Sequence, residues 1–266
     1  KHKFMKLLLK VSYIGTEYSG FQCQKNGRAI QNVLTDAAEQ VFGFPCDVTG
    51  CSRTDAGVHA LGFCCTVAPK ENRGEKWFSI PASKVHRAFA PNLPNDISVV
   101  AAAEVADDFH PRYACCGKEY VYKIWAGKYD DPFLNGRAYR HRKGVSEEGF
   151  RRMQKASENL VGYKDFTSFM ASGSKITDAR RTVLYANVEK TDGMINFTVA
   201  ADGFLYNMVR IMAGTLLDTA QGKFEPEDIA EIIEAKDRSR AGFTAPPEGL
   251  YLSRVFYDEE INWQCE

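Results

Sequence analysis

The stretch GCSRTDAGVHA, residues 50–60, is the most unusual part of the chain, and it leads into an apolar strand predicted at 63–67. It places Arg53, Asp55 and His59 between glycines, and glycine allows a backbone to approach a ligand closely. A simpler interpretation is that Asp55 accepts hydrogen bonds from nearby amides in an Asx-turn. Composition alone favours that interpretation, so the stretch by itself does not establish an active site.

The first half of the chain, outward from this stretch, alternates predicted strands and helices. Apolar residues recur at helical spacing in 29–42, and Gly43 ends the pattern. Residues 1–4 are left out of the fold prediction. The strands are predicted at 5–14, 46–49, 63–67 and 97–105, and the helices at 29–42 and 81–89.

The second half repeats this order. The strands are predicted at 118–125, 180–189, 194–200 and 250–257, and the helices at 146–160, 204–220 and 226–235. Ser146 is the expected N-cap of its helix, and Thr191-Asp192-Gly193 is a hairpin signal. The pattern predicts an α+β fold of two similar α/β halves, 5–116 and 117–266, with antiparallel-rich mixed sheets backed by helices. A site in a cleft between the halves is then expected.

The overall charge of the chain limits the classes of function. Its 266 residues include 34 Lys and Arg and 34 Asp and Glu, so the formal net charge is zero. This excludes a uniformly basic nucleic-acid coat but not a local basic face. No apolar run approaches the roughly 18–20 residues that span a bilayer, and Leu7-Leu8-Leu9 is too short for the core of a signal peptide. We therefore expect a cytoplasmic protein without a membrane segment.

The eight cysteines do not form a recognisable framework. Two pairs are vicinal, at 64–65 and 115–116, and there is no Cys-x-x-Cys, so disulfides are not expected. The five histidines show no zinc spacing with them. We expect reduced thiols, most of them buried as small apolar residues in strands, and no metal.

A lone cation, Arg210, lies in the otherwise apolar helix predicted at 204–220. Burial of a guanidinium is costly unless a partner compensates its charge. A surface arginine that snorkels to solvent is the alternative, but neighbours such as Met208 and Ile211 make the helix apolar nearly all round. The sequence therefore predicts a buried carboxylate partner, and Asp55 is the candidate.

Three residues, Tyr120, Tyr122 and Ile124, share one face of the strand predicted at 118–125. This spacing is typical of a core aromatic stripe, which is the interpretation we favour for Tyr122. A buried tyrosine hydroxyl still needs a partner, and such a residue can lie beside a cleft.

Basic residues gather despite the zero net charge, most densely in 137–143 (RAYRHRK). One such run is usually a solvated face, but several runs with aromatic residues between them suit a surface that binds a phosphate backbone. The other runs are 151–152, 180–181 and 238–240. The chain has no Walker loop, GxGxxG or zinc-deaminase motif, which disfavours nucleotide hydrolysis, dinucleotide redox chemistry and deamination.

With these features in place, the chain resembles the TruA-type tRNA pseudouridine synthases. Residues 50–60 match the family's signature, and RTDAGVHA is its most specific part. The resemblance implies the pseudouridine synthase fold. It extends over nearly the whole chain, through VSYIGTEYSGFQ at 11–22, AIQ at 29–31, FHPRYAC at 109–115, KEYVYKI at 118–124, DPFL at 131–134, FLYNMVRIMAG at 204–214 and TAPPEGLYL at 244–252.

The resemblance implies the isomerisation of uridine to pseudouridine at positions 38, 39 and 40 of the anticodon stem-loop of tRNA. Uracil is detached from C1′, rotated and reattached through C5, with neither a cofactor nor a metal. A base inside a stem must leave the stack for this reaction, so the nucleotide is flipped out. The family forms homodimers in which one tRNA touches both subunits, so tRNA and a second copy are the expected partners.

The resemblance also implies residue roles. Asp55 corresponds to the catalytic carboxylate, Tyr120 to the aromatic residue beside the target base, and Arg210 to the ion-pair partner of Asp55. Arg53 corresponds to the arginine that fills the space left by the flipped nucleotide, and a guanidinium suits both stacking and phosphate pairing. Leu250 corresponds to a residue of the substrate pocket. His59 and Arg112 are further predicted RNA contacts, and the basic run at 137–143 adds Arg140 and Arg142.

Several alternatives stay open at this point. Asp55 acts either as a nucleophile at C1′ or as a base toward the 2′ proton, and Tyr120 acts either as a base or only by stacking. A non-catalytic tRNA-binding chaperone of the same fold is the alternative function, and the presence of Asp55 disfavours it. An RNA N-glycosylase, which would release free uracil, is a third possibility.

Overall fold

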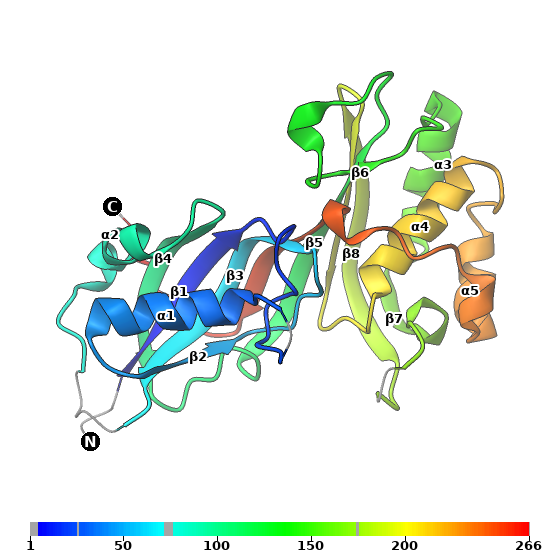
Figure 1. Ribbon diagram of the computed structural model, residues 1–266. Helices are drawn as coiled ribbons and strands as arrows, with labels where there is room; N and C mark the ends of the chain where they lie inside the picture. The colour runs from blue at the N-terminus through cyan, green and yellow to red at the C-terminus, as the bar shows by residue number, and fades with distance from the viewer. Residues whose placement is uncertain (1–4, 26, 72–76, 174–175, 266) are drawn as a thin grey trace. The chain divides into compact units, whose positions relative to one another are not determined.

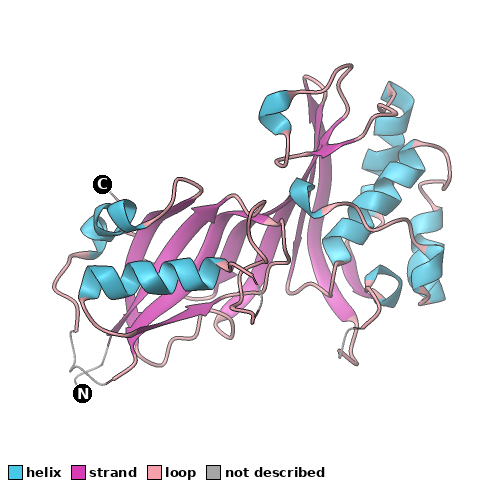
Figure 2. Ribbon diagram, viewed as in Figure 1, coloured by secondary structure: helices cyan, strands magenta, loops and turns pink. Residues whose placement is uncertain are grey.

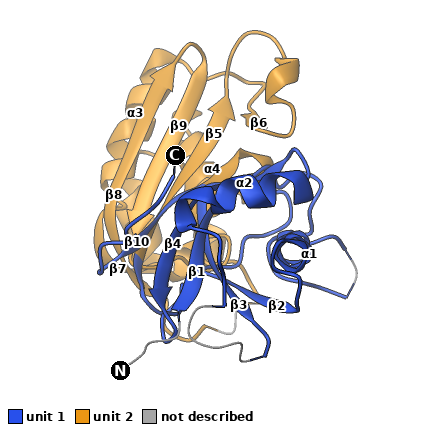
Figure 3. Cartoon of the chain, turned by 90° about the vertical axis from the view of Figure 1, so that its left-hand side faces the viewer, with its two compact units in different colours: residues 1–116, 252–266 blue, residues 117–251 orange. Residues whose placement is uncertain are grey.

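The computed structural model describes residues 5–25, 27–71, 77–173 and 176–265. Residues 1–4, which the sequence prediction set aside, lie outside the described residues. The chain divides into two compact units (Figure 3). Unit 1 comprises Lys1–Cys116 and Leu252–Glu266, and unit 2 comprises Gly117–Tyr251.

Unit 1 is built on a sheet in which the strands follow the order β4-β1-β3-β10, with β2 paired to β3 (Figure 1). The strands are β1 (Met5–Tyr13), β2 (Cys46–Gly50), β3 (His59–Pro69), β4 (Ile97–Ala106) and β10 (Leu250–Tyr257). The central strand β1 is antiparallel to both neighbours, so Leu9 lies opposite Cys65 on one side and Ala102 on the other. Because β10 lies beside β3, the segment from Leu252 onward belongs to unit 1, whereas the sequence prediction grouped it with the second half.

Two helices pack on this sheet. They are α1 (Ile30–Phe42) and α2 (Val85–Phe89), with 3₁₀ turns at Ala82–Lys84 and Ala90–Asn92. The first helix buries Ile30, Leu34 and Ala37 on one face, as their spacing predicts. It ends at Gly43, which adopts the left-handed conformation with φ 76°. The rings of Phe42 and Phe89 lie 6.1 Å apart between centroids, so an aromatic contact joins the two helices.

The strands of unit 2 follow the order β5-β9-β8-β7. Its strands are β5 (Cys115–Trp125), β6 (Tyr139–Arg140), β7 (Gly162–Asp165), β8 (Arg180–Thr191) and β9 (Met194–Ala201). The path is antiparallel, with Tyr122 opposite Phe197, and the short β6 adds a parallel pairing to β5. This sheet is therefore mixed and mostly antiparallel.

Three helices cover one face of the unit 2 sheet (Figure 2). They are α3 (Glu147–Glu158), α4 (Met208–Ala220) and α5 (Asp228–Ala235). The cap of α3 is the predicted one, because the Ser146 hydroxyl accepts a hydrogen bond from the Gly149 amide at 3.0 Å. Helix α4 is buried on nearly all sides, which explains its apolar sequence.

The predicted fold class, α+β with antiparallel-rich mixed sheets backed by helices, is confirmed, but several boundaries differ. Strand β3 begins at His59 rather than 63, and β5 begins at Cys115 rather than 118. Helix α4 begins at Met208 rather than 204. Asn207 adopts a left-handed conformation with φ 58°, which does not fit within a right-handed α-helix. The short strands β6 and β7 were not predicted. Within the residues described, no helix is long and apolar enough to cross a membrane.

Candidate active site

The Asp55 turn, residues 51–58, connects β2 to β3 in unit 1 and is held by backbone contacts with an earlier segment. The amide of Phe21 donates to the Thr54 carbonyl at 3.1 Å, and the amide of Gly57 donates to the Tyr18 carbonyl at 3.3 Å. Within the turn, the amide of Val58 donates to the Asp55 carbonyl at 3.2 Å. The half-buried Asp55 side chain is thus carried by a backbone that is fixed on both sides.

The close approach of the two segments explains a glycine at position 20. Gly20 has φ 100°, a conformation that L-residues rarely adopt, and a Cβ there would lie 2.4 Å from the carbonyl oxygen of Thr54. The next residue continues the contact, because the ring of Phe21 stacks on Phe63 of β3 with centroids 4.2 Å apart. The segment containing Gly20 and Phe21 is therefore fitted against the Asp55 turn, and any side chain at position 20 would push the two apart.

His59 differs from its predicted role as an RNA contact. Its side chain is fully buried, and Nδ1 accepts a hydrogen bond from the amide of Gly15 at 2.9 Å. A ring nitrogen that accepts carries no proton, so in the neutral imidazole the proton sits on Nε2. His59 therefore supports the start of β3 from inside the protein rather than offering a surface to RNA.

Two further polar contacts brace the segment that holds the turn, and no sequence pattern predicted either of them. The buried Tyr13 hydroxyl shares a hydrogen bond with the Thr54 hydroxyl at 2.8 Å. Tyr18 donates its hydroxyl proton to Asp96 Oδ1 at 2.7 Å. Burial, followed by this bond to a carboxylate, raises the pKa of Tyr18 to about 12, so Tyr18 keeps its proton at neutral pH.

In unit 2, Tyr120 lies on β5 with 7% of its surface exposed. The rings of Tyr120 and Phe204 are in edge-to-face contact, and their centroids are 5.0 Å apart. Its neighbour on the same face, Tyr122, is fully buried and donates to the Pro246 carbonyl at 2.7 Å, and burial raises its pKa. The core interpretation of Tyr122 is confirmed.

Arg210, in the first turn of α4, is oriented by two neutral oxygen acceptors of its own unit. Nε donates to the Ala245 carbonyl at 2.7 Å, and Nη1 donates to Asn207 Oδ1 at 2.9 Å. The amide of Ala245 returns a bond to the Arg210 carbonyl at 3.0 Å. The left-handed backbone of Asn207 thus places an amide oxygen where it fixes the guanidinium plane. The pairing of Arg210 with Asp55 joins residues of different units and stays a prediction.

Leu250, the predicted pocket residue, follows directly on a segment that packs against Tyr122. It is 7% exposed and comes immediately after the 3₁₀ turn Pro247–Gly249. A Cβ at Gly249 would lie 2.6 Å from the Tyr122 ring, so backbone and ring are in tight contact there. Within unit 2, Tyr122 and Arg210 thus both donate to carbonyls of the segment that leads to Leu250, at Pro246 and Ala245.

The arginines predicted to bind RNA differ in how they are held. Arg53 and Arg112 are exposed. The Arg140 side chain is 23% exposed, with Nε donating to Asp130 Oδ1 at 2.7 Å and Nη1 donating to the Trp125 carbonyl at 3.2 Å. Arg142 is 75% exposed and meets the other oxygen of Asp130 at 3.0 Å. Arg140 is therefore held by contacts within the protein, whereas Arg142 presents its charge to solvent, and the RNA contacts of both stay predictions.

The cysteines are divided between buried and exposed positions. All eight cysteines are free, and four of them, Cys46, Cys51, Cys64 and Cys65, are buried. Across the described parts of the chain, no group of three or more His, Cys, Asp or Glu side chains could hold a metal ion. The predicted reduced state fits these free thiols, although half of them rather than most are buried.

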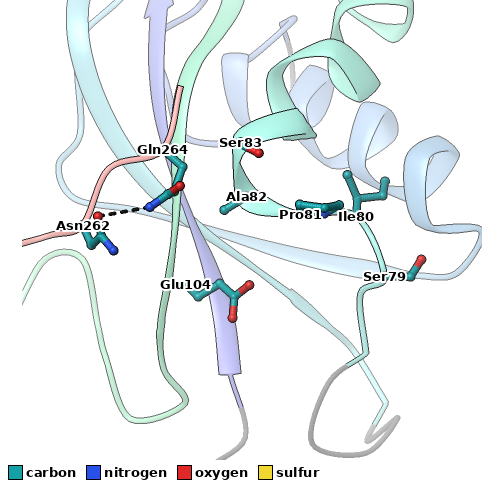
Figure 4. Close-up of a pocket in the computed structure, with 8 residues that line it drawn as sticks. All are labelled: Ser79, Ile80, Pro81, Ala82, Ser83, Glu104, Asn262 and Gln264. Carbon is teal, nitrogen blue, oxygen red and sulfur yellow. Dashed lines mark hydrogen bonds between the residues drawn. The ribbon is translucent and has the colours of Figure 1, made fainter. Parts of the chain in front are cut away.

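A pocket of about 430 Å³ lies in unit 1, away from the Asp55 turn in sequence (Figure 4). Its lining consists of Ser79, Ile80, Pro81, Ala82, Ser83, Glu104, Asn262 and Gln264. The close-up shows these side chains on three separate segments, with a hydrogen bond between Gln264 and Asn262 at 3.1 Å. This lining includes none of the predicted site residues.

Comparison with known proteins gives relatives over nearly the whole chain. The family model described as tRNA pseudouridine synthase matches residues 10–114 and 156–258. A tRNA pseudouridine synthase A from Thermoanaerobacter sp. (strain X514) is 41% identical over 251 residues, which cover 94% of this chain and 99% of that protein. The protein of the same name from Acetivibrio thermocellus is 40% identical, over 94% of this chain and 98% of that protein. The one from Staphylococcus saprophyticus is 35% identical, over 95% of this chain and 91% of that protein.

Proposed function

Because the chain belongs to the tRNA pseudouridine synthase family, it converts uridine to pseudouridine in tRNA, and we propose that it acts in the anticodon stem-loop, at positions 38–40, with Asp55 as the catalytic carboxylate. The observation that carries this proposal is the Asp55 turn. Its backbone is held by Phe21 and Tyr18, so the residue that carries the carboxylate has a fixed place in the chain before substrate arrives. Such positioning is a large part of what an enzyme contributes to a reaction.

The reaction needs no oxidant or reductant, because the product is an isomer of the substrate. The bond between C1′ and N1 breaks, uracil turns over, and a bond forms between C1′ and C5. The proton leaves C5, and N1 gains one. Asp55 serves either as the nucleophile at C1′ or as the base that removes the 2′ proton; both roles need the ionised carboxylate.

Other residues support this chemistry from both units. Tyr120, held edge-on by Phe204, is proposed to lie beside the target base, and Leu250 to line the pocket. Arg210 is proposed as the ion-pair partner of Asp55, and the two oxygens that orient its guanidinium support a fixed role. The exposed Arg53, two residues from Asp55, is proposed to fill the space left by the flipped nucleotide.

The proposed partners are tRNA and a second copy of this chain. The exposed Arg112 and Arg142 are proposed as RNA contacts, since charged side chains that reach solvent can pair with phosphates. Homodimer formation is proposed from the resemblance to the family, as is action in the cytoplasm.

The substitution Asp55→Asn tests the proposal. It keeps the shape of the side chain and removes its charge, so tRNA binding should be retained while isomerisation falls by several orders of magnitude. Release of tritium from C5-labelled uridine in an anticodon stem-loop measures the reaction, and a binding titration on the same RNA measures affinity. Asp47→Asn, on the exposed side of β2 in the same unit, is the matched control and should behave like the wild type.

Two outcomes would contradict the proposal. Isomerisation by Asp55→Asn at more than a trace of the wild-type rate would remove Asp55 from the chemistry. Free uracil as the product of the wild type would indicate an N-glycosylase instead.

A further inference from the structure

The connection between β5 and α3 carries a feature that the proposed catalytic roles do not use. We name residues 128–143 (KYDDPFLNGRAYRHRK) the 128–143 segment; it contains the 3₁₀ turn Pro132–Leu134 and the strand β6. Figure 1 draws it in green around the label β6. Although it has almost no regular secondary structure, its backbone is held at several points.

The first half of the segment is braced by Trp125 and by one acid. Trp125 Nε1 donates to the Tyr129 carbonyl at 2.8 Å. Asp130 accepts from Arg140 Nε at 2.7 Å and pairs with Arg142 at 3.0 Å, so one carboxylate links both ends of the segment. These two arginines lower the pKa of Asp130, which keeps the link ionised at neutral pH.

The middle of the segment is held independently. Asp131 Oδ1 accepts from the amide of Phe133 at 2.9 Å and so caps the 3₁₀ turn. The Tyr251 hydroxyl donates to the Arg137 carbonyl at 2.5 Å. The parallel pairing of β6 with β5 then fixes the end of the segment. A backbone held in this way loses little conformational entropy when it binds a partner.

This braced backbone presents two large aromatic rings to solvent. Phe133 is 83% exposed and Tyr129 is 71% exposed, values that place both among the most exposed apolar side chains described. Single exposed apolar residues are normal in a soluble protein. Two rings on one rigid segment are instead typical of a binding surface, because rigid aromatic groups give contact area at low entropic cost.

The charge around the rings identifies the kind of partner. The segment contains five Lys and Arg against two Asp, a formal net charge of +3 in a chain whose total is zero. Lys128, Arg137, Arg142 and Lys143 are exposed. Protein interfaces are depleted in lysine, whereas surfaces for single-stranded nucleic acid combine cations for phosphates with aromatic rings on which bases stack.

We infer that the 128–143 segment binds an unpaired nucleotide of the tRNA substrate, with the base stacked on Phe133, Tyr129 as a second stacking surface, and the neighbouring cations on phosphates. The inference rests on the proposed function, which supplies tRNA as the substrate. The inference assigns the recognition of unpaired bases to this segment, in addition to the electrostatic attraction of its cations for any polyanion.

Binding measurements with Phe133→Ala test the inference. We titrate the variant at several salt concentrations with a full-length tRNA transcript, an anticodon stem-loop and a blunt duplex of the same stem. Removal of the ring should weaken binding of tRNA or the stem-loop roughly five- to a hundredfold, the range that stacking of one base supports. The salt slope should not change, because no cation is lost, and duplex binding should stay as in the wild type. Phe133 is exposed, so melting should also be unaffected.

Three matched variants separate stacking from other causes. Phe133→Trp keeps a ring and should restore binding, whereas Phe133→Leu keeps apolar bulk without a π-face and should remain weak. Tyr163→Ala removes a ring that is 65% exposed on β7 of the same unit, and binding should be unchanged.

The inference is overturned if Phe133→Ala binds all three RNAs like the wild type, if duplex binding falls as much as stem-loop binding, or if Phe133→Leu binds normally. A change in oligomeric state of Phe133→Ala, measured by sedimentation, would assign the rings to a second copy of the chain and would overturn it as well. Failure of the proposed function is distinguishable, because it would appear in the wild type as tRNA binding without any pseudouridine.

Discussion

The amide of Gly15 donates a hydrogen bond to Nδ1 of His59 across 2.9 Å, inside unit 1 and without exposure of the ring to solvent. The two residues are 44 positions apart, and the bond joins the end of β1 to the start of β3. This contact fixes one side of the segment that follows the Asp55 turn. His59 is therefore a positioning residue in a motif that otherwise points to catalysis.

Replacement of His59 by alanine should destabilise unit 1 and leave RNA affinity unchanged. The Gly15 amide would lose its acceptor in a buried place, which costs about 1–3 kcal/mol of the free energy of unfolding. Denaturant titration measures this loss, and a salt-dependent binding series on tRNA measures the affinity. A reduced salt slope with unchanged stability would instead support the original prediction of an RNA contact.

Replacement of Gly20 by alanine should disturb the Asp55 turn. The new Cβ would lie 2.4 Å from the Thr54 carbonyl, in addition to the strain of a residue with φ 100°. We expect a lower kcat with little change in KM. Gly43→Ala is the control, because Gly43 also has a positive φ of 76° but a Cβ there meets no atom within 4 Å. If both variants lose the same stability and neither loses kcat, the close approach does not position Asp55.

Removal of the Tyr120 hydroxyl distinguishes its two proposed roles. Tyr120→Phe keeps the ring that meets Phe204. If the hydroxyl moves a proton, the single-turnover rate should fall on the order of 100-fold, and this is the result we expect. Tyr122→Phe, which removes the bond to the Pro246 carbonyl, should cost about 1 kcal/mol of stability with a near-normal rate. A near-normal rate for Tyr120→Phe would leave stacking as its role.

The two arginines on Asp130 should respond differently to substitution by glutamine. Arg142 is 75% exposed, so Arg142→Gln should lower the salt slope of tRNA binding by about one unit for a lost phosphate contact. Arg140 is 23% exposed and bonded to the Trp125 carbonyl, so Arg140→Gln should loosen the segment and raise its protease sensitivity. Equal salt slopes for Arg142→Gln and the wild type would remove Arg142 from the RNA interface.

The sequence patterns predicted those helices and turns that depend on residues close together in the chain. Helix α1 follows from the spacing of its apolar residues, and the hairpin between β8 and β9 follows from Asp192 and Gly193, which both have positive φ as a tight turn requires. Strand β7 is only four residues long and half polar, so it carried no periodicity to detect. The start of β3 was hidden because the turn residues of RTDAG run directly into it.

The catalytic roles of the site residues stay predictions, and the contacts that support the Asp55 turn had no signal in the sequence. The resemblance to the family's motifs assigns roles to Asp55, Tyr120 and Arg210, because each of them lies within a stretch of sequence that matches such a motif. The contacts that hold the Asp55 turn join residues far apart in the chain, as in the bond between Tyr18 and Asp96 at a separation of 78. Pairings of this kind depend on how the strands assemble, and one sequence contains no local signal for them.

The return of the chain to unit 1 at Leu252 has a consequence for synthesis on the ribosome. Strand β10 is made after the whole of unit 2, yet it completes the sheet of unit 1 beside β3. Until β10 leaves the ribosome, that edge of β3 has no strand paired to it. An unpaired strand edge can pair with other chains. The half that carries Asp55 is begun first, yet its sheet becomes complete only after all of unit 2 has been synthesised.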